Sequence, residues 1–221
     1  MCHSLYRHSR EKAWVRFMTD NISFEKVTAE YYDVLKELGN IGAGNATTAL
    51  AQMLQCKVDM KVPQVRLLNF NEVGEVMGGE EQIVVGIYLA VEGDITGSMM
   101  FILEQNAGIT LVEKLMGVKT SPEGFGEIEL SAMKEIGNII TGAYLNSLSQ
   151  LTNLKMLPSV PDLSIDMLNA ILSVPAIEFG IMGDQILLIQ TQFTDEVDLN
   201  GYFVLLPDLE SYVKILSALG L

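Results

Sequence analysis

The stretch DVLKELGNIGAG, residues 33–44, recurs in similar form as SAMKEIGNIITG, residues 131–142. Both copies place a glutamate, an asparagine and glycines within a segment that has the pattern of an amphipathic helix. Glycine inside a helix costs about 1 kcal/mol relative to alanine, so helix stability does not explain the repeated phrase. A single offset of 98 residues relates the pairs Asp33/Ser131, Glu37/Glu135, Gly39/Gly137, Asn40/Asn138, Gly44/Gly142 and Pro63/Pro161.

This offset holds over about 30 residues and indicates an internal duplication. We expect one domain over residues 25–221, made of two repeats at about 25–120 and 125–221. The junction is expected at residues 119–127, KTSPEGFGE, which contain a proline and two glycines. Residues 1–24 are expected to be an N-terminal extension, either disordered or preceding an alternative start at Met18. A partner-binding amphipathic arm is the alternative for this segment.

At 100° per residue, the polar residues of each copy gather on one helix face. In the first copy this face carries Asp33, Glu37, Asn40, Gly44, Thr47 and Thr48, and in the second Ser131, Glu135, Asn138, Gly142 and Asn146. The apolar face carries Leu35, Leu38, Ala46, Ala49 and Met53 in the first copy, and Met133, Ile136, Ile140 and Leu151 in the second. Each copy thus presents a glutamate one turn before an asparagine on the solvent side. A glycine one turn further on would let another backbone approach, which suggests a docking surface.

A plain structural explanation exists for a single copy. Glutamate and asparagine are common on exposed helix faces, and glycines in a helix also permit close packing against a neighbouring helix. Two copies at one offset, each with a proline at the same distance downstream, favour the functional explanation.

The remaining pattern predicts an α+β fold with largely antiparallel sheet. After the first long helix we expect a strand at 57–70, a hairpin centred on residues 92–94, and a short helix at 106–117. After the second long helix we expect a short helical insertion at 166–172, strands at 175–183, 185–193 and 201–207, and a helix at 208–219. The two halves should be related by a pseudo-twofold axis and form one compact unit.

Composition excludes several classes of function. The net charge of −14 argues against binding to nucleic acid or to an anionic membrane surface, and favours a basic protein partner. Two cysteines and two histidines provide neither a disulfide framework nor a zinc site, so we expect a reducing, cytoplasmic location and no metal of its own. Two uncharged runs, 38–56 and 136–154, are long enough to span a bilayer but too rich in amides and hydroxyls, so we expect no membrane insertion.

At the repeated phrase the chain resembles the CheC-type chemotaxis phosphatases. The family pattern is Asp or Ser, three residues, Glu, two residues, Asn, about 22 residues and then Pro. Both copies match it, with Asp33, Glu37, Asn40 and Pro63 in the first and Ser131, Glu135, Asn138 and Pro161 in the second. The resemblance covers residues 25–221.

The resemblance implies hydrolysis of the aspartyl phosphate on the response regulator CheY, and binding to the deamidase CheD. It implies that Glu37 and Glu135 dock the regulator and that Asn40 and Asn138 orient the attacking water. Asp33, Ser131, Gly44, Gly142, Pro63 and Pro161 would support these sites. Magnesium would be supplied by the phosphorylated regulator.

Two other readings remain. The first is a non-catalytic binding module for phosphorylated CheY or CheD, resembling a flagellar-switch adaptor; two intact asparagines favour the enzyme over it. The second is a small-molecule enzyme that uses GNIGAGN, residues 39–45, as a phosphate loop. That phrase fits neither common phosphate-binding glycine pattern and has no lysine after it.

Overall fold

The computed structural model describes residues 29–55, 59–69, 72–121, 124–178, 185–194 and 198–219. The first half contains α2 (Ala29–Leu54), β1 (Asp59–Asn69), α3 (Val73–Val76), β2 (Ile83–Gly93), β3 (Gly97–Glu104) and α4 (Gln105–Met116). The second contains α5 (Glu127–Thr152), β4 (Met156–Pro158), β5 (Asp162–Met167), α6 (Leu168–Glu178), β6 (Gln185–Thr194), β7 (Asp198–Pro207) and α7 (Leu209–Ala218). The N-terminal extension predicted at residues 1–24 lies outside the described residues.

The strands form one seven-stranded sheet in the order β1-β6-β7-β3-β2-β4, and β5 also pairs with β2. Every strand pairing within the described residues is antiparallel. The strand that follows each long helix pairs with the hairpin of the other half: β1 lies on β6, whereas β4 and β5 lie on β2. The two halves are therefore interlocked through the sheet.

The strand order has the symmetry that a duplication predicts. If β1 is exchanged with β4 and β5, β2 with β6, and β3 with β7, the strand order is the same when read from the opposite edge of the sheet. The centre of the sheet is the β3–β7 pair, in which Phe101 lies opposite Phe203. The predicted α+β fold with two pseudo-symmetric halves and antiparallel sheet is confirmed.

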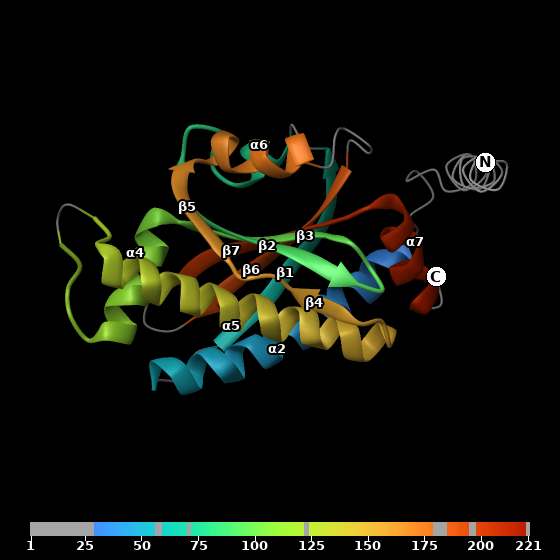
Figure 1. The fold of residues 1–221 in the computed structure, drawn as a ribbon, viewed down its shortest axis with the longest axis horizontal. Helices are drawn as coiled ribbons and strands as arrows, with labels where there is room; N and C mark the ends of the chain where they lie inside the picture. Colours follow the sequence, from blue (N-terminus) through green and yellow to red (C-terminus); the bar gives the residue numbers. More distant parts are fainter. Residues whose placement is uncertain are drawn as a thin grey trace, which may run out of the picture.

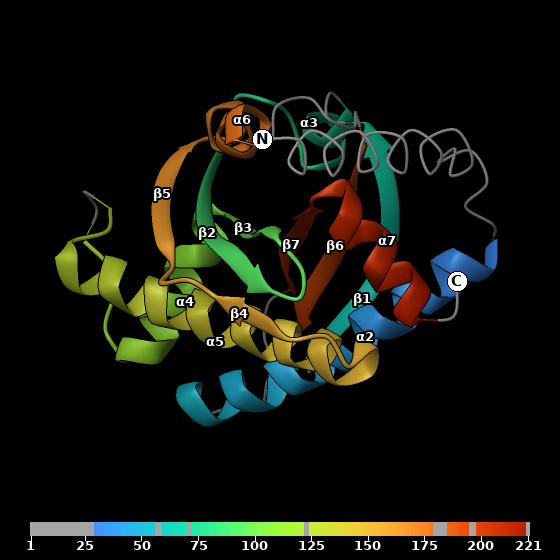
Figure 2. The same ribbon diagram turned by 45° about the vertical axis from the view of Figure 1, so that its right-hand side comes forward.

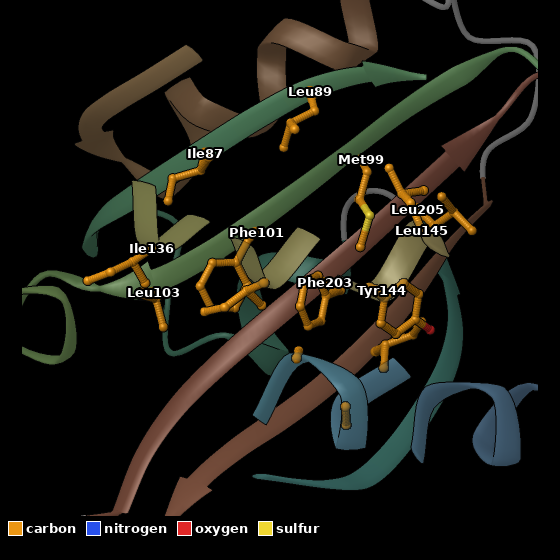
Figure 3. Packing of buried hydrophobic residues seen from close by; sticks show 14 of the residues in the cluster. Ile87, Leu89, Met99, Phe101, Leu103, Ile136, Tyr144, Leu145, Phe203 and Leu205 are labelled. Atoms are coloured by element: carbon orange, nitrogen blue, oxygen red, sulfur yellow. The ribbon is translucent and has the colours of Figure 1, made fainter. Parts of the chain in front are cut away.

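The sheet separates two layers of helix. In both views α2 and α5 lie on one side of it and α6 on the other (Figures 1 and 2). On the side of the long helices, Phe101, Phe203 and Tyr144 form the centre of the larger core, as Figure 3 shows. The ring centroid of Phe203 lies 4.8 Å from that of Phe101 and 4.9 Å from that of Tyr144. This stack fixes α5 against the sheet.

One predicted strand is wrong. Residues 175–178, assigned to a strand at 175–183, continue helix α6, and residues 179–184 lie outside the described part of the chain. The buried residues Leu168, Ile171 and Leu172 have helical spacing and pack on the face of the sheet opposite α5. A short apolar run does not reveal by itself whether it is a strand or a buried helix. The helical insertion expected at 166–172 begins only at Leu168 and continues to Glu178, whereas residues 166 and 167 end strand β5, which the sequence did not predict.

Candidate functional site

The two repeated phrases lie on α2 and α5, which pack side by side and run in opposite directions (Figures 1 and 2). At their crossing a Cβ added to Gly42 would lie 2.5 Å from Cδ2 of Tyr144, so only glycine admits the ring there. Nearby, Asn45 Nδ2 donates a hydrogen bond of 2.9 Å to Oγ of the buried Ser147. These contacts fix how the helices cross, and thereby where the two copies lie relative to each other.

The glycines of the phrases divide into two groups. Gly39 and Gly137 are buried, and a Cβ on Gly137 would overlap the side chain of Ile87 on β2. Gly42 lets α2 lie close to α5, and Gly137 lets α5 lie close to the sheet. A Cβ added to Gly44 or Gly142 would meet nothing within 4 Å. Packing therefore explains the first group of glycines and leaves the second unexplained.

The predicted site residues of each copy share one helix. Glu37, Asn40 and Gly44 are exposed on α2. On α5, Ser131 and Glu135 are exposed, whereas Asn138 and Gly142 are half-buried. We call Glu37, Asn40 and Gly44 the first stripe, and Ser131, Glu135, Asn138 and Gly142 the second stripe. Asp33 lies on α2, but its side chain is outside the described part of the structure.

Both glutamates of the stripes are available to a partner. The carboxylates of Glu37 and Glu135 form no hydrogen bond or ion pair with another residue in the described part of the chain. The same holds for the side chains of Asn40 and Asn138. Each stripe therefore presents one carboxylate and one amide that the fold itself does not use.

The stripes face away from each other. On α5, Ser147 points to α2 and Gly137 points to β2. At 100° per residue, Asn138 lies about 100° from Gly137 in one direction and Ser147 about 80° from it in the other. The second stripe thus lies on the side of α5 that turns away from α2. The first stripe has the equivalent position on α2. There Asn45 is the residue that meets the other helix, and the first stripe lies on the side of α2 that turns away from α5.

The predicted polar and apolar faces need two corrections. Thr47 was placed on the exposed face, but it is half-buried and donates to the carbonyl oxygen of Ala43 at 2.7 Å; its counterpart Leu145 is buried. The side chains at this pair of equivalent positions, 47 and 145, point partly toward the sheet. Leu151 was placed in the core but is 42% exposed, because it lies in the last turn of α5, beyond the buried Leu148.

The two prolines do not lie on the stripes. Pro63 lies in β1, at the register shift between Lys61 and Gln64. Pro161 is half-buried and lies between β4 and β5, immediately before β5 begins. Proline has no N–H to donate to a strand ladder, so each repeat interrupts its edge strand at the same point. The prolines shape the strand that follows each long helix and support the site only through it.

The structure also shows a contact that the repeat alignment did not reveal. The duplicate of Gly42 is Ile140, and the duplicate of Ala46 is Tyr144. The copies therefore differ where the helices meet, and a large residue on α5 is accommodated by a small one on α2. Comparing the repeats for such small-to-large exchanges would have pointed to this crossing.

Within the described residues, no three His, Cys, Asp or Glu side chains lie together in a way that would hold a metal ion. In the same part of the chain, no helix is sufficiently long and apolar to cross a bilayer.

Comparison with known proteins places the chain in one family. The CheC-like family model matches residues 32–66 and 128–165, which contain both stripes and the strands that follow. The CheY-P phosphatase CheC of Bacillus subtilis is 38% identical over 203 residues, which are 89% of this chain and 97% of that protein. The flagellar motor switch phosphatase FliY of the same organism is 29% identical over 135 residues, 58% of this chain and 34% of the relative. The chain belongs to the CheC-like family.

Solved structures agree on the fold. FliY of Thermotoga maritima superposes with a TM-score of 0.72 at 22% identity, covering 88% of this chain and 98% of that one. The middle domain of FliM from H. pylori gives a TM-score of 0.66 at 13% identity, covering 87% and 99%. At these identities the similarity concerns the arrangement of helices and sheet.

Proposed function

We propose that this chain is a phosphatase that hydrolyses the aspartyl phosphate of the response regulator CheY, with one site at each stripe. The observation that carries the proposal is the pair of Glu-x-x-Asn turns on accessible helix faces, whose side chains have no partner within the described ranges of the chain. Support comes from the 38% identity to a CheY-P phosphatase over nearly the whole of that relative.

In the proposed reaction, Asn40 or Asn138 positions a water molecule in line with the phosphorus atom. An amide side chain both donates and accepts hydrogen bonds, so it can hold the water and direct its oxygen. The water oxygen bonds to phosphorus, the bond from phosphorus to the aspartate oxygen breaks, and inorganic phosphate and a carboxylate result. Such a reaction requires positioning more than covalent help from the protein.

Glu37 and Glu135 dock the regulator in this proposal. Each carboxylate lies one turn before its asparagine and has no partner among the residues that the structure describes. A lysine beside the regulator's phosphorylation site would form a charge-assisted hydrogen bond with it and thereby set the register of the complex. Gly44 and Gly142 leave room for the regulator's backbone beside the asparagines.

The proposal includes three further features of the resemblance. Magnesium comes from the phosphorylated regulator, CheD is a second protein partner, and the location is cytoplasmic. Metal dependence is directly testable: this chain, treated with chelator, freed of it and assayed with fresh magnesium, should retain full activity. Lasting loss would show that the chain holds its own metal.

The central test is phosphate release from phosphorylated CheY with and without this chain. We expect faster release with the wild-type chain and only the regulator's own rate with the Asn40→Ala/Asn138→Ala variant. If the wild-type chain binds phosphorylated CheY but does not speed phosphate release, the chain is a non-catalytic binding module and not an enzyme. Full turnover by the double variant would show that the asparagines are not catalytic.

A further inference from the structure

The second stripe continues toward the beginning of α5 with an apolar residue. Ile128 lies in the first turn of that helix and is 71% exposed. Burial of its side chain would contribute free energy, yet the fold leaves it in water. An exposed apolar residue on its own is ordinary, so its position relative to the site decides whether it matters.

Ile128 belongs to the same helix face as the proposed catalytic residues. Residues 128, 131, 135 and 138 are spaced by three, four and three, and such spacing keeps them within about 80° of one another around the axis. At 1.5 Å per residue, Ile128 lies about 10 Å from Glu135 along the helix. Ile128 therefore lies on the same face as the second stripe, less than one helical turn before Ser131.

A regulator docked at the second stripe would reach Ile128. Even a small signalling interface buries about 600 Å² on each partner, which corresponds to a patch of about 14 Å radius. A patch centred between Glu135 and Asn138 would extend to Ile128 at the start of the helix. Its occupant is thus the same protein that the glutamate and the asparagine engage.

The two copies differ at this point. At the offset of 98 residues, the counterpart of Ile128 is Glu30, and the counterpart of Ser131 is Asp33. The first copy thus carries carboxylates where the second has an apolar and a hydroxyl side chain. The same regulator cannot make the same contacts at both sites.

We infer that Ile128 is a specificity-determining contact of the second site, where it binds an apolar side chain of the phosphorylated regulator at the edge of the docked surface, about 15 Å along the helix from Asn138. This inference rests on the proposed function. It distinguishes the two sites by the surface they select: the second recognises a regulator with an apolar side chain at that place, and the first recognises one that is polar or basic there.

The test uses a chain in which only the second site works, the Asn40→Ala variant. In that background, Ile128→Ala should raise the KM for phosphorylated CheY about five- to tenfold, the effect of losing roughly half the burial of three carbon groups. The kcat should stay the same, because the water-positioning group is intact. Ile128→Leu should stay within about twofold of the parent, since it keeps an apolar side chain of equal size.

A matched control is Val160→Ala, which removes another exposed apolar side chain, 86% exposed and located between β4 and β5, outside both stripes. It should change neither KM nor kcat. The melting temperature of the Ile128 variants should equal that of the parent, because the side chain is mainly in water. An unchanged KM in Ile128→Ala, or an equal rise in Val160→Ala, would overturn the inference while leaving the phosphatase intact. Failure of the proposed function itself would instead appear as a wild-type chain that releases phosphate from phosphorylated CheY no faster than the regulator does alone.

Discussion

Replacing Gly44 and Gly142, the glycines of the two stripes, by alanine should make the protein more stable and less active. A Cβ at Gly44 or Gly142 meets no atom within 4 Å, so the folded chain accommodates it without strain. Alanine is favoured over glycine in a helix interior by about 0.8–1.0 kcal/mol. The double variant Gly44→Ala/Gly142→Ala should therefore gain about 2 kcal/mol, or roughly 4–8 °C in melting temperature for a domain of this size.

Activity should change in the opposite direction. If these glycines admit the regulator's backbone, each added methyl group separates the docked surfaces beside an asparagine. Misplacement of the reacting groups by about 1 Å costs on the order of 100-fold in rate. We expect the double variant to lose at least that much in kcat/KM for phosphorylated CheY while remaining fully folded.

Thermal unfolding and phosphate release on the same preparations measure both effects. Gly137→Ala provides the matched control, because its Cβ would lie 2.8 Å from Cγ2 of Ile87. It should lower stability by about 1–3 kcal/mol through overpacking. A double variant that is stabilised but fully active would refute the docking role of Gly44 and Gly142. A destabilised double variant would show that the space beside them is not free.

Three more predictions follow from the same geometry. Asn40→Ala and Asn138→Ala should each slow their own site by roughly 10² to 10³, so each single variant keeps the activity of its untouched site and only the double variant falls to the regulator's own rate; a single variant as slow as the double would show that the sites depend on each other. Asn45→Ala removes the hydrogen bond to Ser147 and should cost about 0.5–1.5 kcal/mol in unfolding experiments with kcat unchanged; a normal melting temperature would contradict the stabilising role of this bond. Residues 125–221 expressed alone should not give a folded circular dichroism spectrum, since β4 and β5 pair with β2 of the other half, whereas co-expression with the first half should restore it; a folded second half alone would contradict the interlocked sheet.

Local patterns in the sequence were sufficient for the overall plan of the molecule. The offset between the two phrases predicted the duplication, apolar runs on either side of residues 92–94 predicted the β2–β3 hairpin, and helical patterns predicted α4 and α7. The polar helix faces were also visible, because a helical period places Glu37 with Asn40 and Glu135 with Asn138 whatever surrounds them. Apart from the duplication, which compares two segments 98 residues apart, these features depend only on neighbours within a few residues along the chain.

The tertiary structure alone decided which residues meet across the two halves. Pairing of β1 with β6 and of β5 with β2 joins strands more than 70 residues apart, and no local pattern specifies that exchange. The same long-range packing separates Gly42 and Gly137, which are in contact with other elements, from Gly44 and Gly142, which are not. A glycine has no side chain whose polarity could indicate its surroundings, so its role follows only from the atoms that the fold brings against it.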